Sequence, residues 1–273
     1  MSRRSTIGVF DSGVGGLTVL AALLQRIPDA DFLYFGDTAR LPYGSKSAET
    51  VAHYAVGAVH FLQERGAERL VIACNSATAL AFDAIKAASR VGVVGVVEPG
   101  AQAAAAESKN RNVVVLGTQA TVGSHAYRRA LESKGVVVKE KACPLFVPLV
   151  EEGWLEHPVT DMVARIYLSE AFSDDAQNAD VLVLGCTHYP LIKPLLRRLV
   201  PANIAIVDSA ESTAQAVAEQ LRIDPLPTSS EGERRAQTRL RFFATDSAEK
   251  FRAMGTRFLG HPVEQVEHVD LKE

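Results

Sequence analysis

Two cysteines occupy matching places in the chain, which suggests a shared chemical role. Cys74 and Cys186 each follow an apolar, β-branched run, over residues 70–73 and 181–185, and each precedes small polar residues. In an open α/β sheet, ligands bind at the carboxyl ends of the strands. Two thiols at equivalent strand ends of two similar half-chains would face each other across one cleft. That arrangement suits removal of a proton from one face of a carbon and its return to the other face.

A thiol is suited to such acid–base chemistry, because its pKa when free is about 8.5 and falls beside cations or helix N-termini. Cys74 and Cys186 are both expected where a strand passes into a helix, so both would lie at a helix N-terminus. A buried free cysteine is often only a packing residue, but the matched positions favour a functional pair. Cys143, which precedes Pro144 in an apolar segment, is predicted to be structural.

His188 stands two residues after Cys186, and this spacing leaves several interpretations open. A cysteine with a histidine is typical of a nucleophilic hydrolase. A zinc site is disfavoured because the paired-ligand spacings are missing. Either Glu151 or Glu152 could orient His188 or assist a thiol, although two solvated loop acids are the simpler interpretation.

A glycine-rich turn over residues 10–17 follows the first predicted strand and opens a helix. Such turns present backbone N–H groups to an anion. The turn matches neither the P-loop nor the dinucleotide-binding pattern, so a small carboxylate ligand is favoured over a nucleotide. Asp11 would repel an anion and would instead suit an ammonium group or a proton transfer; a helix N-cap is the competing interpretation.

A second tight loop, residues 41–45, follows the next predicted strand. Pro42 and Gly44 shape this loop so that its backbone donors could face the cleft. The simplest interpretations are that Asp37 closes a turn and that Tyr43 packs. Residues 148–154 occupy the equivalent place in the second half of the chain.

Strand-like runs alternate with helical patterns through most of the chain, which predicts α/β architecture with mostly parallel sheets flanked by helices. Strands are expected over residues 7–10, 31–35, 70–73 and 91–97, and again over 113–116, 136–139, 181–184 and 204–207. Helices are expected over 16–26, 47–64, 77–89, 124–134 and 160–172. Polar residues end corresponding strands of the two halves: residues 11–12 match Thr118 and Thr121, and residues 74–76 match 186–188.

The last elements of the chain are predicted to pack on the first half. A helix over 211–221 precedes a polar stretch, 224–235, that is typical of an exposed loop. A strand over 240–244, a helix over 247–258 and a strand near 263–269 follow, too few elements for a separate domain. We therefore expect two similar α/β domains, residues 1–98 plus 212–273 and residues 99–211, with the active site in the cleft between them.

The composition narrows the class of protein. Hydrophobic residues make up 47% and charged residues 22%, which is normal for a soluble globular chain. A net charge of −3 without a basic stretch argues against a nucleic-acid partner. No apolar run approaches the roughly 20 residues of a membrane span, so no membrane partner is expected. Three cysteines without CxxC spacing argue against a disulfide framework and favour a reducing compartment, and the N-terminus is interpreted as cytosolic.

Taken together, the motifs resemble those of the glutamate racemases. The likeness rests on residues 8–16, 36–38 with 42–44, 73–75 and 185–191, which occur in the family's order, and it extends to 258–260. The most specific motif is the last cysteine segment, because aspartate racemases typically carry Glu where this chain has His188. The resemblance implies a cofactor-independent racemase without a metal, which makes D-glutamate for peptidoglycan. It also implies a cytoplasmic enzyme, usually a homodimer.

The resemblance also implies roles for individual residues. Cys74 and Cys186 would be the two acid–base residues, with Asp11 assisting near Cys74, and His188 and Glu152 assisting near Cys186. The residues expected to hold the substrate's ammonium and carboxylate groups are Asp11, Ser12, Pro42, Tyr43, Gly44, Asn75, Ser76, Thr118, Thr121, Thr187 and His188. Ser76 stands where many relatives have Thr, a change that keeps the hydroxyl.

Three other functions remain as alternatives. An aspartate-specific racemase would differ only in the substrate's side-chain length. A cysteine-dependent amidase or hydrolase would use one thiol with His188 as its base, so Cys74 would be dispensable. A two-lobed binding protein would need neither thiol and would usually be exported.

Overall fold

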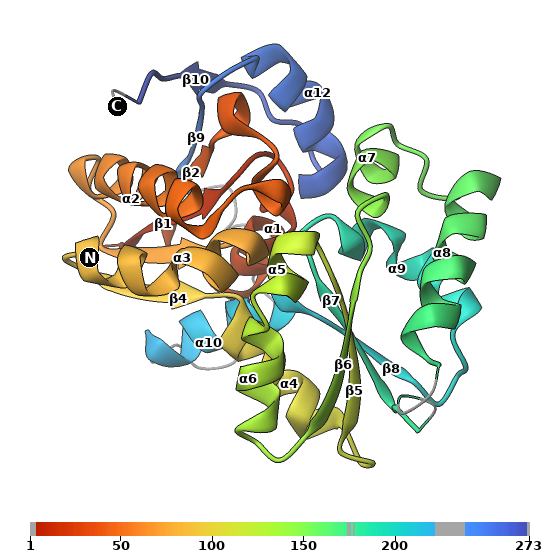
Figure 1. Cartoon of the computed structure of the whole chain (residues 1–273). Helices are drawn as coiled ribbons and strands as arrows, with labels where there is room; N and C mark the ends of the chain where they lie inside the picture. The colour runs from red at the N-terminus through yellow and green to blue at the C-terminus, as the bar shows by residue number, and fades with distance from the viewer. Residues whose placement is uncertain (1–3, 174–175, 177, 222–237, 272–273) are drawn as a thin grey trace.

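The computed structural model describes residues 4–173, 176, 178–221 and 238–271. Their strands form two separate parallel sheets, flanked by helices (Figure 1). The first sheet has the order β10-β9-β2-β1-β3-β4. Its strands are β1 (Thr6–Asp11), β2 (Asp31–Gly36), β3 (Arg69–Ile72), β4 (Gly92–Gly95), β9 (Leu240–Ala244) and β10 (Val266–His268). The second sheet has the order β6-β5-β7-β8, with β5 (Asn112–Gly117), β6 (Val137–Ala142), β7 (Val181–Gly185) and β8 (Ala205–Asp208).

The central strands are apolar on both faces, as parallel sheets covered by helices require. All five residues of β7 are buried, and in β1 only Thr6 is partly exposed. All the strand pairs of the two sheets are parallel. The predicted α/β fold with mostly parallel sheets is therefore confirmed.

The two sheets share one strand order, β2-β1-β3-β4 and β6-β5-β7-β8. In each set, the strand that comes first in the chain, β1 or β5, lies between the second and the third strands. Phe10 is paired with Ile72 in the first sheet, and Gly117 with Gly185 in the second. The strand order reverses at these pairs, and ligands bind at such reversals in doubly wound sheets. Cys74 follows β3 and Cys186 follows β7, so their matched positions are a property of the fold.

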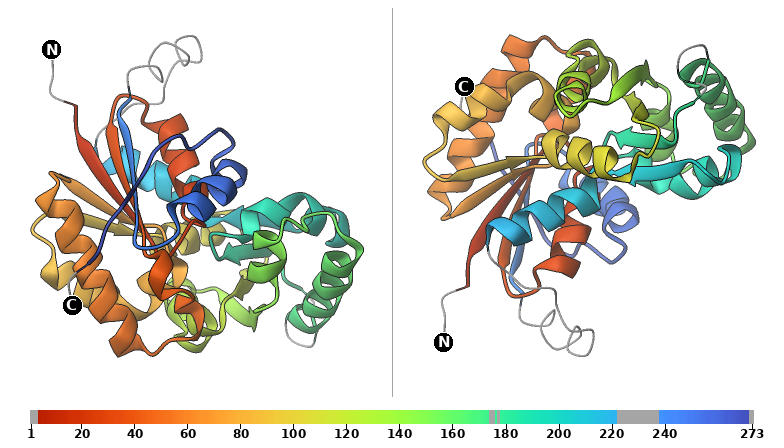
Figure 2. Two further views of the ribbon diagram at one scale, coloured as in Figure 1. Left: turned by 90° about the horizontal axis from the view of Figure 1, so that it is seen from above. Right: turned by 90° about the horizontal axis from the view of Figure 1, so that it is seen from below.

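Helices cover both faces of the first sheet (Figure 2). One face packs on α2 (Ala48–Glu64) and α3 (Asn75–Ala88), and the other on α1 (Leu17–Arg26), α10 (Ser209–Gln220) and α12 (Ala248–Leu259). The second sheet is flanked by α4 (Val97–Glu107), α5 (Gln119–Gly123), α6 (Ala126–Glu132), α7 (Phe146–Glu151), α8 (Pro158–Ala171) and α9 (Lys193–Leu199). Short 3-10 helices are η1 (Thr38–Arg40), η2 (Tyr43–Ser45) and η4 (Tyr189–Ile192).

One hydrophobic core joins the two sheets. Val9 of β1, Leu20 of α1, Val217 of α10 and Leu184 of β7 belong to the same buried cluster. The tail returns to the first sheet, where β9 pairs with β2 and β10 with β9. The division into two domains at the residues given above remains a prediction. Within the described ranges, no helix is both long and apolar enough to cross a membrane.

Several elements differ from the sequence-based expectation. The strand expected over 91–97 ends at Gly95, and α4 begins at Val97, so the expected boundary at 98–99 lies in the first turn of a helix. The helix expected over 124–134 is wrong in its extent, because His125 takes a left-handed conformation (φ 55°) between α5 and α6. Part of the expected loop 148–154 is helical, in α7. The predicted loop over 224–235 lies outside the described residues.

Candidate active site

Cys74 lies at the N-terminus of α3, immediately after β3. Its Sγ accepts a hydrogen bond from the backbone N–H of Ala77 at 3.4 Å, as an N-cap side chain does. Its thiol donates to Ser12 Oγ at 3.5 Å. Burial raises the pKa of Cys74 to about 12, and the nearby charge of Asp11 adds to the rise. Cys74 is therefore a protonated thiol at neutral pH, able to donate its proton.

Asp11 ends β1 beside Cys74 and is almost completely buried. Its Oδ2 accepts the backbone N–H of Gly13 at 2.8 Å, while its Oδ1 is buried without a hydrogen-bond partner. Burial raises the pKa of Asp11 by more than the charge of His188 and the backbone N–H groups of Gly13 and Gly16 lower it. The N-cap of α1 is Gly16, so Asp11 does not cap that helix. An unpartnered buried carboxylate oxygen suits a bound ammonium or a transferred proton.

Cys186 follows β7 and belongs to a row of three side chains. Its Sγ lies 3.9 Å from Nδ1 of His188, whose Nε2 lies 3.2 Å from Oε1 of Glu151. Burial lowers the pKa of His188, but hydrogen bonds to Cys186 and Glu151 outweigh it and raise the pKa to about 10. Burial alone would raise the pKa of Glu151. The hydrogen bond from His188 and the positive charges of His188 and Lys250 outweigh burial, so the pKa of Glu151 is lowered. His188 is therefore an imidazolium at neutral pH, held between a carboxylate and a sulfur.

The acid that contacts His188 is Glu151 and not Glu152, which corrects the choice made from the sequence. Glu151 is the last residue of α7 and turns toward His188. Glu152 follows the helix and is exposed. On a short helix, neighbouring residues point about 100° apart, so only one of them can face the histidine.

The expected hydroxyl residues of the two halves meet directly. Ser76 Oγ of α3 lies 2.9 Å from Oγ1 of Thr118, which caps α5 and bonds to Oγ1 of Thr121 at 3.0 Å. Gly44 packs against Thr118: a Cβ at Gly44 would lie 3.1 Å from the threonine Cβ. Thr118 thus brings together residues from the loop after β2, the start of α3 and the start of α5.

A second contact between the halves lies at the glycine-rich turn. Thr18 Oγ1 of α1 donates to the carbonyl oxygen of Thr187 at 3.0 Å. A Cβ added to Gly15 would lie 2.3 Å from Thr187 Oγ1 and 2.5 Å from His188 Nδ1. Glycine at position 15 therefore allows the turn to approach the Cys186 segment closely.

Two of the residues expected to bind the substrate, Asn75 and Tyr43, use their side-chain polar groups in hydrogen bonds within the protein. Asn75 Oδ1 accepts from Tyr127 OH at 2.8 Å, and its Nδ2 donates to Ser209 Oγ at 3.3 Å. Tyr43 OH donates to Asp37 Oδ2 at 2.6 Å. Pro42, before Tyr43, forms a cis peptide bond with Leu41.

Sequence reasoning missed the roles of Tyr127 and Ser209 and gave Asp37 only a turn. The carboxylate of Asp37 also accepts from Thr245 and Arg40, each at 2.9 Å, so it holds η1 and η2 to the end of β9. The signal available in the sequence was an aspartate directly after a buried strand, before the Pro–Gly loop.

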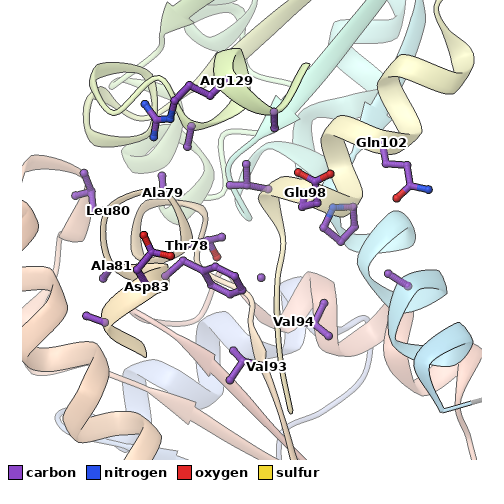
Figure 3. A pocket seen from close by; sticks show the side chains of 18 of the residues that line it. Thr78, Ala79, Leu80, Ala81, Asp83, Val93, Val94, Glu98, Gln102 and Arg129 are labelled. Carbon is purple, nitrogen blue, oxygen red and sulfur yellow. The ribbon is translucent and has the colours of Figure 1, made fainter. Parts of the chain in front are cut away.

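A separate cavity of about 880 Å³ lies between α3, β4, α4 and α6 (Figure 3). Its polar lining includes Asp83, Glu98, Gln102 and Arg129. None of the expected site residues lines it, so it is distinct from the cysteine site. Within the described part of the chain, no cluster of His, Cys, Asp and Glu could hold a metal ion.

Comparison with known proteins identifies the family of this chain. The family model described as Asp/Glu/Hydantoin racemase matches residues 10–217. The chain belongs to this racemase family. It is 61% identical to the glutamate racemase of Koribacter versatilis, over 99% of each chain. The resemblance inferred from the motifs is therefore confirmed.

Solved structures of racemases share the fold over almost the whole chain. The glutamate racemase of Thermus thermophilus, in complex with β-chloro-D-alanine, is 44% identical with a TM-score of 0.84 and 98% coverage of both chains. That of Francisella tularensis, in complex with D-glutamate, is 32% identical with a TM-score of 0.87 and the same coverage.

Replacing Asp11 of this racemase with asparagine is expected to stabilise the fold at neutral pH while reducing activity about a hundredfold. The raised pKa means that the folded protein binds this proton more tightly than the unfolded protein. Ionised Asp11 therefore costs folding free energy once the pH exceeds the unfolded-state pKa of about 3.9. Asparagine removes that cost and can still accept the Gly13 N–H.

Thermal unfolding of both proteins between about pH 4 and pH 8 checks this expectation. The melting temperature of the variant relative to wild type should increase as the pH rises. A variant that is less stable than wild type near pH 8 would contradict the burial argument.

Proposed function

We propose that this racemase interconverts L- and D-glutamate by a two-base mechanism in which Cys74 and Cys186 act on opposite faces of the α-carbon. The observation that carries the proposal is the equivalence of the two thiols. Each follows the third strand of an equivalent parallel set, and each has its own buried partner, Asp11 or His188. The glutamate racemase names of the similar proteins support the choice of glutamate.

In the proposed reaction, one cysteine as thiolate takes the α-proton and the other as thiol donates a proton to the opposite face. With L- and D-glutamate the two cysteines exchange these roles. The α-proton of an amino acid is weakly acidic, so the site must stabilise the carbanion by placement and by hydrogen-bond donors around the α-carboxylate. We assign these donors to Ser12, Ser76, Thr118, Thr121 and Thr187, together with backbone N–H groups of residues 43–44 and 75.

The partners of the cysteines take distinct roles in this mechanism. Asp11, with its free buried oxygen, would hold the substrate ammonium or exchange a proton near Cys74. His188 would exchange a proton with Cys186, and Glu151 would keep its imidazole oriented and charged. This gives Glu151 the role that the sequence assigned to Glu152.

We further propose the cellular setting that goes with this activity. The product D-glutamate would supply peptidoglycan synthesis in the cytoplasm, and the active protein would be a homodimer. Glutamate would be its small-molecule partner, with no nucleic acid or membrane involved.

The test is incubation of purified, pyridoxal-free protein with L-glutamate in D₂O, with optical rotation and α-hydrogen exchange followed together. Loss of rotation with deuterium entering at the α-carbon supports the proposal, and L-aspartate alongside tests the substrate. Racemisation of aspartate in preference to glutamate would favour the aspartate-specific alternative. Absence of exchange with both amino acids would overturn the proposal.

A further inference from the structure

The helix α12 contacts the Cys186 side of the active site, although it packs on the half of the protein that carries Cys74. Gly255 of α12 lies against Leu17 of α1: a Cβ there would be 3.2 Å from the leucine. Phe258 of the same helix packs edge-on to the imidazole of His188, with ring centroids 5.1 Å apart. Figure 1 shows α12 beside α7, the helix that ends at Glu151.

The polar contact between these two helices is made by Arg257. Its Nη1 donates to the carbonyl oxygens of Glu151 at 2.9 Å and Val150 at 3.2 Å. Carbonyl groups in the last turn of a helix lack helical partners, and a cation is favourable at that end. Arg257 thus binds the C-terminus of α7 at the residue whose side chain contacts His188.

Gly153, which lies just after α7, leaves the space that the Arg257 guanidinium needs to reach the end of this helix. Its backbone is left-handed (φ 79°), which ends α7, and a Cβ at this position would lie 2.7 Å from Nη2 of Arg257. Lys250, on the first turn of α12, adds a positive charge that lowers the pKa of Glu151. Three residues of α12 therefore act on the Glu151–His188 pair: Lys250, Arg257 and Phe258.

We propose that Arg257 is a positioning residue, which holds the end of α7 so that Glu151 stays against His188 beside Cys186. The inference rests on the proposed racemase function and adds to it a residue that touches neither thiol. The geometry at Cys186 would then depend on α12, a helix that packs on the half of the protein carrying Cys74.

Replacing Arg257 with alanine is expected to reduce kcat for L-glutamate about tenfold, since charge-assisted hydrogen bonds and small displacements have effects of this size. KM should change by less than about threefold, because Arg257 is placed on a helix end and not on the substrate groups. Arg257→Lys keeps the charge and should restore part of kcat. Arg252→Ala is the matched control: Arg252 is an exposed arginine of the same helix, and its side chain makes no polar contact among the described residues.

A double-mutant cycle tests whether Arg257 acts through Glu151. When Glu151→Gln is already present, adding Arg257→Ala should lower kcat by a further factor of less than about two, because the carboxylate that Arg257 positions is already lost. If Arg257→Ala lowers kcat by the same factor in the Glu151→Gln background as in wild type, the two residues act independently and the proposal is overturned.

The imidazole of His188, titrated by NMR, gives a readout that general loss of stability would not move. The charged and titratable groups that face it are Cys186, Glu151 from α7 and Asp11 from β1, while α12 presents Phe258. Arg257→Ala should lower the pKa of His188, because Glu151 would no longer be held against it. An unchanged His188 pKa, or activity equal to that of Arg252→Ala, would refute the role.

These measurements distinguish failure of the proposed function from failure of the positioning role. If wild type does not racemise glutamate, the proposed function fails. If wild type racemises glutamate and Arg257→Ala behaves as wild type, only the positioning role fails. If circular dichroism shows that the alanine variant is unfolded, Arg257→Lys and Arg257→Gln, which keep part of the aliphatic stem, are compared by the same kcat and His188 measurements.

Discussion

Replacing either Cys74 or Cys186 with alanine is expected to lower glutamate racemisation by at least about a thousandfold, because each complete turnover needs both a proton acceptor and a proton donor. Both thiols are buried next to their own partners, so water is not expected to replace either of them. Racemisation is followed by optical rotation in both directions. Cys143→Ala is the matched control: this third cysteine packs in the hydrophobic core, and its thiol donates to the backbone carbonyl of Lys141, so its loss should leave kcat nearly unchanged.

The two single variants should also differ from each other in an informative way. A substrate analogue with a leaving group on the β-carbon needs only one base for elimination. Cys74→Ala and Cys186→Ala should therefore each retain elimination from one enantiomer and lose it from the other. Near-normal racemisation by either variant would contradict the two-base mechanism, and a dispensable Cys74 alone would direct attention to the hydrolase alternative.

Replacing Gly15 with alanine is expected to lower kcat about a hundredfold, with a smaller effect on folding. The new methyl group would lie 2.5 Å from Nδ1 of His188, the atom that faces Cys186, and 2.3 Å from Oγ1 of Thr187. Because these atoms belong to the other half of the protein, the clash can be relieved by moving the Cys186 segment away from the turn. Activity would be lost through that displacement.

Gly57→Ala provides the comparison for Gly15→Ala. Gly57 lies inside α2, where the nearest atom to an added Cβ is Leu271 Cδ1 at 3.8 Å. Alanine is favoured over glycine in a helix interior by up to about 1 kcal/mol, so this variant should be slightly more stable and fully active. Steady-state kinetics and thermal unfolding of both variants check the pair. Full activity of Gly15→Ala would show that the close approach of the two halves is not required.

The features that repeat along the chain were predictable from the sequence. Buried parallel strands produce continuous apolar runs, and strand ends produce the polar residues that follow them, so these local patterns were enough to pair Cys74 with Cys186. The helix α4 was missed because Pro99 and Gly100 look like a loop. Pro99 is the third residue of that helix, where a proline costs little, since the N–H that it lacks would have no helical partner.

Features that depend on the rotation of one short element were not predictable. The choice between Glu151 and Glu152 depends on where α7 ends and how it is held, which involves Arg257 from a distant part of the chain. Asp37 was likewise underestimated, because its partner Thr245 lies at the end of β9. Contacts between segments far apart in sequence leave no local pattern from which to infer them.

The pairing of β2 with β9 has a consequence for the emerging chain on the ribosome. Tyr34 pairs with Phe242, so one edge of β2 stays open until the last part of the sequence has been translated. The strands of the second sheet all lie between Asn112 and Asp208, so that sheet can close earlier. Phe258 and Arg257, which contact His188 and α7, lie further along the chain than β9 and are translated after it. Nascent chains that stop before residue 240 would therefore hold both thiols, yet lack α12, which contacts His188 and α7, and would expose a strand edge that other chains can pair with.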